Sequence, residues 1–179
     1  MEDQALKLLK HPVGIFHWNE SPNSEEIRKA IKNLERFPEE LKKSLAGVTR
    51  EKLKNRYRPQ GWTIAQVVHH LADSHMHSYL RFKHAILEDI PSIKDYKEAD
   101  WAMLEDASHE DISYSIDLLT ALHKRWAFFL NSCSEAQLSR TYFHPERNKH
   151  YPLHTTILLY VWHGIHHIAH IENAKKKGY

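Results

Sequence analysis

Apolar residues recur every three to four positions in four long segments of the chain, which is the periodicity of a helix with one buried face. These segments cover residues 24–45, 62–87, 108–131 and 152–177. We find no convincing run of alternating apolar and polar residues that would indicate a strand. The pattern therefore predicts an all-α protein in which four long helices form a bundle.

Local signals define the ends of these helices. Pro38 predicts a kink or a break in the first helix near Phe37, because proline has no N–H to donate. Thr63 and Gln66 have the spacing of a capping box, which satisfies backbone N–H groups at the start of a helix. Gly178 follows three lysines and is the expected C-terminal cap of the last helix.

The remaining segments are short. Residues 1–22 predict an irregular lead-in because they contain clustered proline and glycine. Residues 134–137 predict a short extra helix, and residues 140–151 predict a long polar loop before the last helix. Neither a repeat nor a linker is evident, so we expect one domain over residues 1–179.

Composition excludes several classes of protein. The chain is 41% hydrophobic and 27% charged, as in ordinary globular proteins. Its 25 basic and 23 acidic residues are interspersed, so no basic patch favours nucleic acid. No apolar run is long enough for a signal peptide or a membrane span. The single cysteine, Cys133, excludes an internal disulfide, which fits a reducing compartment. Together these observations predict a cytoplasmic protein that binds neither membranes nor nucleic acid.

The most informative feature is a run of histidines in the last segment. Four of them stand at positions 163, 166, 167 and 170. Because each helical residue turns by about 100°, these four share roughly one third of the helix circumference. A buried imidazole without a partner is unfavourable, and a bound metal ion is the simplest explanation for four of them on one face.

The spacing also suggests how such an ion is held. His163 and His167 are four residues apart, so their side chains can converge on one ion. A third ligand must come from another helix, and His70 is the best candidate because it flanks the apolar stripe of residues 62–87. His69 points to a different face. Three histidines with a free fourth position are typical of catalytic zinc sites.

Catalytic residues are harder to identify from the pattern. If His163 and His167 are the ligands on the last helix, His166 and His170 remain to support the ligands or to contact a substrate. Asp73 stands one turn after the His70 candidate, where it is either an acid/base group or a surface aspartate. No His-Glu-x-x-His motif is present, so the usual base of a zinc protease is missing.

Several sequence blocks resemble the YfiT-like branch of the DinB-like superfamily. The blocks are Gly61-Trp62-Thr63, the run from Val67 to Met76, Ser78 to Lys83, Tyr142 to Pro145, Tyr160 to His163, and His166 to His170. The element His11-Pro12-Val13-Gly14 is similar as well, so the resemblance covers nearly the whole chain. It departs at Gly164-Ile165, which replaces a more polar Ser-His pair and leaves the ligand candidates intact.

The resemblance implies a four-helix bundle that binds one divalent ion per subunit, zinc or nickel, through three histidines. The family's ligand positions fall on His70, His163 and His167. Members of the family are commonly homodimers. They are described either as metal-dependent hydrolases or as thiol S-transferases that use bacillithiol, mycothiol or glutathione.

Both reactions are chemically coherent, because a metal ion with a free position lowers the pKa of a bound water or thiol. The absence of an evident general-base carboxylate favours the thiol S-transferase, and Arg81 and Lys83 are candidates to bind a carboxylate-bearing thiol cosubstrate. A metal-dependent hydrolase acting on another small-molecule substrate is the first alternative. A non-catalytic, dimeric metal-binding bundle is the second.

Overall fold

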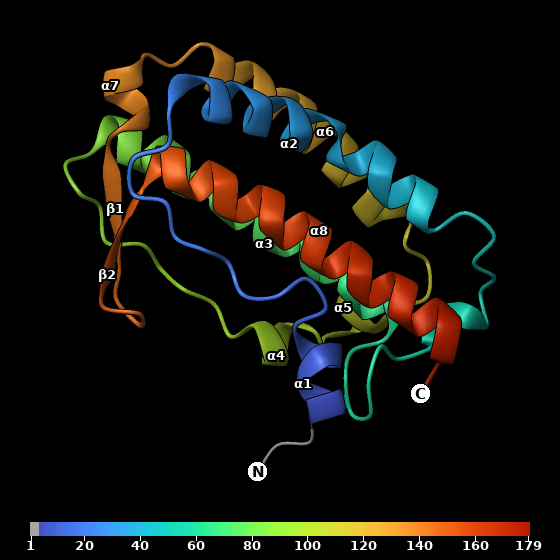
Figure 1. Ribbon diagram of the computed structural model, residues 1–179. Helices are drawn as coiled ribbons and strands as arrows, with labels where there is room; N and C mark the ends of the chain where they lie inside the picture. Colours follow the sequence, from blue (N-terminus) through green and yellow to red (C-terminus); the bar gives the residue numbers. More distant parts are fainter. Residues whose placement is uncertain (1–3) are drawn as a thin grey trace.

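Four long helices dominate the computed structural model, which describes residues 4–179 (Figure 1). They are α2 (Ser24–Ser44), α3 (Ile64–Leu87), α6 (Ser113–Asn131) and α8 (Leu153–Lys177). Both α2 and α3 pack against α6 and against α8, so α2 and α3 occupy opposite corners of the bundle. The predicted four-helix bundle is therefore confirmed.

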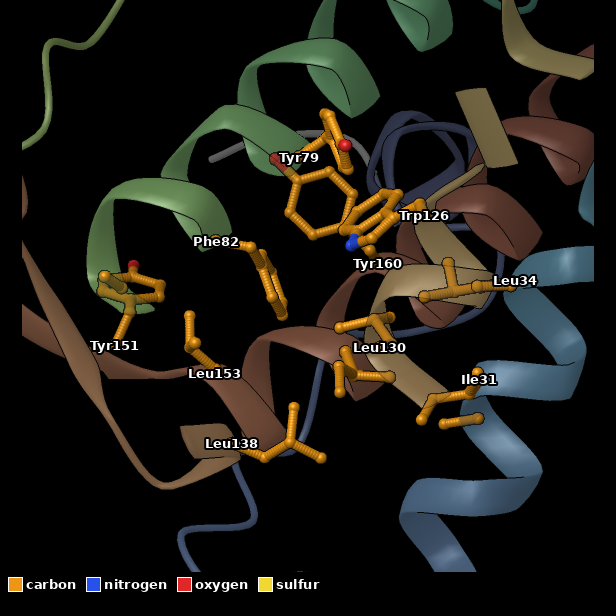
Figure 2. Close-up of a cluster of buried hydrophobic side chains, with 14 of the residues drawn as sticks. Ile31, Leu34, Tyr79, Phe82, Trp126, Leu130, Leu138, Tyr151, Leu153 and Tyr160 are labelled. Atoms are coloured by element: carbon orange, nitrogen blue, oxygen red, sulfur yellow. The ribbon is translucent and has the colours of Figure 1, made fainter. Parts of the chain in front are cut away.

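The core of the bundle consists of two apolar clusters. Figure 2 shows the first, in which the buried rings of Phe82 and Trp126 meet edge to face with centroids 5.4 Å apart. The second cluster includes Phe37 and lies further along the bundle. A buried histidine, His75, contacts both, with ring centroids 5.1 Å from Phe37 and 6.2 Å from Trp126. Imidazoles thus lie in the middle of the bundle.

The predicted capping box at the start of α3 is present. The Thr63 hydroxyl accepts the backbone N–H of Gln66 at 3.1 Å, and the Gln66 side chain accepts the backbone N–H of Thr63 at 3.0 Å. Replacing Thr63 by alanine should lower the free energy of unfolding by about 1 kcal/mol, because one helix-end N–H loses its acceptor. Urea denaturation measures this change, and an unaltered midpoint would contradict it.

Pro38 does not interrupt the first helix, which runs unbroken through it from Ser24 to Ser44. Because proline has no N–H, the carbonyl four residues earlier, that of Leu34, has no helical donor at this position. The side chain of His123 on α6 lies 2.6 Å from that carbonyl oxygen and supplies a donor. Of the predicted kink or break, the break is therefore wrong, and a side chain from a neighbouring helix compensates for the proline.

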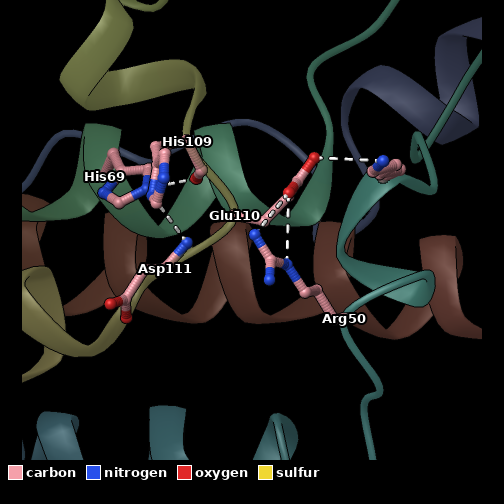
Figure 3. A network of polar contacts seen from close by, with 6 residues as sticks. Arg50, His69, His109, Glu110 and Asp111 are labelled. Carbon is pink, nitrogen blue, oxygen red and sulfur yellow. Dashed lines mark hydrogen bonds and ion pairs between the residues drawn. The ribbon is translucent and has the colours of Figure 1, made fainter.

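The third long helix begins later than predicted. Residues 105–108 form a separate short helix, α5 (Glu105–Ser108), and α6 starts at Ser113. In the loop between them, the side chain of Asp111 accepts the backbone N–H of Ser113 at 3.0 Å and so organises the start of α6. Figure 3 shows this loop, in which the backbone N–H of Asp111 also meets the ring of His109 at 3.0 Å.

The segment predicted as a polar loop contains a β-hairpin. Strands β1 (Thr141–His144) and β2 (Lys149–Pro152) pair antiparallel, with Tyr142 opposite Tyr151. Two aromatic side chains on one face of the hairpin pack onto the bundle, which stabilises strands too short to give a clear alternating pattern. The predicted short helix before the hairpin is present as α7 (Glu135–Leu138).

The lead-in is also more ordered than predicted. Residues 4–10 form α1 (Gln4–Lys10), which packs against α8. Two further short elements complete the described chain, namely η1 (Lys52–Lys54) and α4 (Glu98–Trp101). Within residues 4–179, no helix combines the length and the apolar character that crossing a membrane requires.

Candidate metal centre

Three histidines from two helices meet in the middle of the bundle. His70 comes from α3, and His163 and His167 come from successive turns of α8. One ring nitrogen of each lies within 4.8 Å of those of the other two. The Nε2 atoms of His70 and His163 are 3.4 Å apart. Among the described residues, this group contains three imidazoles and no carboxylate or thiol.

Burial favours the neutral form of all three imidazoles. Burial, with a smaller effect from His166, lowers the pKa of His70 to about 4. Burial also lowers the pKa values of His163 and His167 well below the usual range, and the neighbouring imidazoles lower them further. Neutral imidazole is the form that binds a metal ion. The donor set therefore fits a divalent ion of the zinc type.

His163 lies at the end of a row of imidazoles that the sequence analysis did not identify. Its Nδ1 atom is 3.1 Å from Nε2 of His75 on α3. The Nδ1 atom of His75 is in turn 2.7 Å from Nε2 of His123 on α6, and His123 contacts the carbonyl of Leu34. Both His75 and His123 are fully buried. Their positions on the apolar faces of α3 and α6 were the available signal, because leucine is expected there.

His167 has a shorter row on its other side. Its Nδ1 atom lies 3.4 Å from Nδ1 of His170, whose Nε2 atom lies 3.2 Å from the carbonyl oxygen of Lys10 in α1. The ring of Tyr57 stacks on His170 with centroids 3.9 Å apart. Both predicted supporting residues thus lie beside a ligand candidate, because the ring of His166 also meets that of His167 edge to face with centroids 5.2 Å apart.

The structure places His166 beside the ligand candidates and Asp73 away from them. His166 stacks on Trp162 with ring centroids 4.7 Å apart, and burial lowers its pKa to about 4. Asp73 lines a separate pocket beside His69 and Asp106, where burial and then the Asp106 charge raise its pKa to about 6. The pocket around Asp73 includes none of the three ligand candidates.

His69 faces away from the site, as predicted. Its ring contacts the hydroxyl of Ser115 at 2.8 Å and the carbonyl of His109 at 2.9 Å, and the second contact is visible in Figure 3. The same loop is held by Glu110, which forms an ion pair with Arg50 at 3.3 Å. This network fixes the approach of α6 and takes no part in the metal centre.

A pocket of about 360 Å³ opens beside His163. It is lined by aromatic side chains from the N-terminal segment, the hairpin and α8, and by charged residues from α3, the segment that follows it and the hairpin turn. Arg81, a predicted binding residue, is buried in this wall and forms an ion pair with Asp95 at 3.1 Å. His144 of the hairpin lies on the other side of the same carboxylate, at 3.7 Å.

The second predicted binding residue lies elsewhere. The ammonium group of Lys83 is positioned over the ring of Phe129 at 4.1 Å, and Lys83 is not among the residues that line the pocket. The pocket instead includes Glu98 and Arg147, which the sequence analysis did not single out. Both stand in segments without helical periodicity, so the pattern of the sequence contained no signal that they approach α8.

Comparison with known proteins agrees with the geometry of the fold and the site. Residues 33–171 match the family model described as the DinB superfamily. The chain is 41% identical to the Bacillus subtilis (strain 168) protein named "Putative metal-dependent hydrolase YfiT", over 94% of this chain and 95% of the relative. It is 43% identical to a protein of the same description from Bacillus cereus (strain B4264), over 94% and 96%.

Solved structures show the same relationship. The structure of YfiT from Bacillus subtilis, described as a probable metal-dependent hydrolase with an unusual four-helix bundle topology, superposes with a TM-score of 0.93. That match has 41% identity and covers 95% of this chain and 97% of YfiT. A mycothiol-dependent maleylpyruvate isomerase shares the fold at a TM-score of 0.51 and 17% identity, covering 85% of this chain and 63% of the isomerase.

Fold and site together define a four-helix bundle with a buried cluster of three histidines suited to a metal ion. The chain belongs to the DinB superfamily, and it is similar to YfiT of Bacillus subtilis over nearly its whole length.

Proposed function

We propose that this chain is a metal-dependent enzyme that holds one divalent ion, zinc or nickel, with His70, His163 and His167. The observation that carries this proposal is the meeting of three neutral imidazoles within 4.8 Å of one another beside a pocket. Three histidine ligands are typical of catalytic zinc sites, whereas structural sites use four protein ligands. The names of the Bacillus relatives support the same class. When bound, such an ion lowers the pKa of the molecule it coordinates.

The pocket beside His163 supports a small-molecule substrate. Three buried polar atoms of its lining residues, Nε of Arg81, Nε1 of Trp162 and Nδ1 of His144, have no partner within the described protein. The first two are N–H donors, and a buried donor without an acceptor is unfavourable. We infer that the substrate presents an oxygen-rich or anionic group to them, while the aromatic walls hold its apolar part.

We place hydrolysis first among the possible reactions because the pocket contains a carboxylate suited to proton transfer. Glu98 lines the pocket, and although its side chain is exposed, the nearby protein desolvates its carboxyl group and raises the pKa. A raised pKa brings a carboxyl closer to neutral pH, where it can accept and return a proton during a reaction. The sequence-based preference for thiol transfer relied on the lack of such a carboxylate, and Glu98 removes that reason.

Thiol S-transfer is the second candidate, and the charge of the pocket favours it. Arg81 and Arg147 line the same wall. Arginine binds carboxylates through a planar set of N–H groups, so the pair can recognise a carboxylate-bearing thiol such as bacillithiol, mycothiol or glutathione. In this reaction Glu98 has no required role.

One experiment distinguishes these functions. The protein is freed of metal, reloaded with zinc or nickel, and assayed for ester and amide hydrolysis and for thiol consumption with a generic electrophile. Hydrolysis is expected to depend on the metal and to fall by about 10²-fold or more in Glu98→Gln, the range of general acid–base catalysis. Metal-dependent thiol consumption that Glu98→Gln leaves intact would establish the transferase instead. A loaded protein without either activity would support the non-catalytic bundle.

The two residues predicted to bind a carboxylate-bearing thiol cosubstrate provide a matched pair of variants. Arg81→Lys keeps the charge beside Asp95 but loses the Nε donor, so KM for a carboxylate-bearing substrate should rise about tenfold or more, as expected for a hydrogen bond to a charged group. Lys83→Met is expected to leave KM unchanged because Lys83 lies over Phe129, outside the pocket. Equal effects of the two substitutions would contradict the assignment of the pocket.

The homodimer implied by the family resemblance is a further proposal. Light scattering coupled to size-exclusion chromatography tests it directly. We expect twice the 21.2 kDa mass of the chain.

A further inference from the structure

Two rows of hydrogen-bonded imidazoles connect the ligand candidates of α8 to backbone carbonyls of two other helices, α2 and α1. We call His163, His75, His123 and the Leu34 carbonyl the first relay, and His167, His170 and the Lys10 carbonyl the second relay. Each row begins at a group that can only accept a hydrogen bond. That property determines where every proton in the row must lie.

The first relay starts at a carbonyl that a proline makes available. Pro38 cannot donate to Leu34 within α2, and Nδ1 of His123 is 2.6 Å from the Leu34 oxygen. A carbonyl oxygen only accepts, so Nδ1 of His123 must carry the proton. In a neutral ring the other nitrogen is then an acceptor, which leaves a lone pair on Nε2 of His123.

The same reasoning passes along the row. Since Nε2 of His123 accepts, Nδ1 of His75 must donate to it across the 2.7 Å contact. Nε2 of His75 is then an acceptor, and Nδ1 of His163 must donate to it at 3.1 Å. Burial lowers the pKa of His75 well below its usual range, in agreement with neutral rings. The outcome is a lone pair on Nε2 of His163, the atom that faces His70.

The second relay gives the same result for the other ligand of α8. The last carbonyls of a helix accept donors from outside it, and Nε2 of His170 lies 3.2 Å from the carbonyl oxygen of Lys10 at the end of α1. Nε2 of His170 therefore donates, and its Nδ1 atom accepts from Nδ1 of His167 at 3.4 Å. This leaves the lone pair of His167 on Nε2.

We propose that His75, His123 and His170 are positioning residues whose relays fix the protons of His163 and His167 on Nδ1 and present both Nε2 lone pairs to the ion. This inference rests on the proposed metal-dependent function. Hydrogen bonds from the second nitrogen of a ligating imidazole are known to orient the ring and to raise its basicity. Here this support extends through further imidazoles to α2 and α1. The role of Pro38 is to leave the Leu34 carbonyl available to His123.

The proton positions can be measured without any metal. In ¹⁵N-labelled, metal-free protein at about pH 8, where exposed imidazoles are also neutral, long-range ¹H–¹⁵N correlation identifies the protonated nitrogen of each ring. We expect Nδ1–H in His123, His75, His163 and His167, and Nε2–H in His170. A proton on Nε2 of His123 or His75 would overturn the first relay, and one on Nδ1 of His170 would overturn the second.

Substitution of a residue that does not touch the ligands tests the effect at a distance. In His123→Phe, the His75 ring loses its acceptor and can turn its proton to Nε2, so the proton of His163 should no longer be confined to Nδ1. Zinc affinity, measured against a chelating dye, should fall about tenfold to a hundredfold. Trp126→Phe is the control, because Trp126 packs on His123 with ring centroids 5.8 Å apart but takes no part in the relay.

The outcomes separate this inference from the proposed function. An unchanged His163 proton and an unchanged zinc affinity in His123→Phe would overturn the relay while the metal site stands. Equal losses in Trp126→Phe would reduce the role of His123 to packing and would also overturn it. A wild-type protein with the expected protons that binds neither zinc nor nickel would refute the proposed function itself. If His123→Phe does not fold, His170→Phe tests the second relay by the same two measurements.

Discussion

Replacing His163 by alanine is expected to abolish stoichiometric metal binding. His163 is one of the three proposed ligands, and it is also the ligand candidate that lines the proposed substrate pocket. Two remaining imidazoles leave a divalent ion without a complete set of protein ligands for a catalytic site. The variant should therefore contain no bound metal and show no metal-dependent activity.

The matched control for this variant is His150→Ala. His150 is exposed on β2 and belongs to neither relay. Elemental analysis of both purified variants is expected to give one ion per chain for His150→Ala and none for His163→Ala, with equal helical circular dichroism. A His163→Ala protein that retains one tightly bound ion would show that the ligands are assigned wrongly.

Acidification is expected to destabilise the metal-free protein strongly between pH 7 and 5. Burial lowers the pKa of His123 to about 4 in the folded protein, against 6.5 in the unfolded chain. As the pH falls, the unfolded chain therefore binds a proton before the folded protein does. The resulting loss of free energy of unfolding is absent above about pH 6.5 and increases as the pH falls toward 4. With these pKa values, His123 alone lowers the free energy of unfolding by about 2 kcal/mol at pH 5.

Other histidines of the centre add to this effect. Burial also lowers the pKa of His70 to about 4, which contributes a similar amount. A total of about 4 kcal/mol is a large part of the 5–15 kcal/mol that stabilises a typical domain. Urea denaturation of metal-free protein at several pH values measures the loss, and His123→Phe should show a smaller dependence on pH. A free energy of unfolding that stays constant over this range would contradict the neutral state of these imidazoles.

The helical framework and the three ligand candidates could be predicted from the sequence because both follow from helical spacing. An apolar stripe places a helix in the bundle, and two histidines four residues apart must share a face. His70 could be added because it flanks such a stripe. These residues lie on long helices, where a position in the sequence determines a direction in space.

His170 could be proposed as a supporting residue because it shares the helix face of the ligands, but His75 and His123 could not, because their contacts join distant segments. His75 and His123 look like polar interruptions of two apolar faces, and only the packing of α3 against α6 brings them together. Glu98 and Asp95 belong to the segment after α3, which has no periodic pattern to indicate where its side chains point. The hairpin is stabilised by a few aromatic contacts with the bundle, which its sequence pattern does not show. Pro38 was interpreted as the site of a kink or a break, whereas the helix continues through it and one carbonyl becomes available to a neighbouring helix.

The most direct test of the metal centre is a crystal structure of the zinc-loaded protein with anomalous scattering recorded at the zinc edge. We predict one strong peak per chain, about 2.0–2.1 Å from a ring nitrogen of His70, of His163 and of His167. A peak at any other group of residues, or loaded crystals without a peak at these three histidines, would contradict the account.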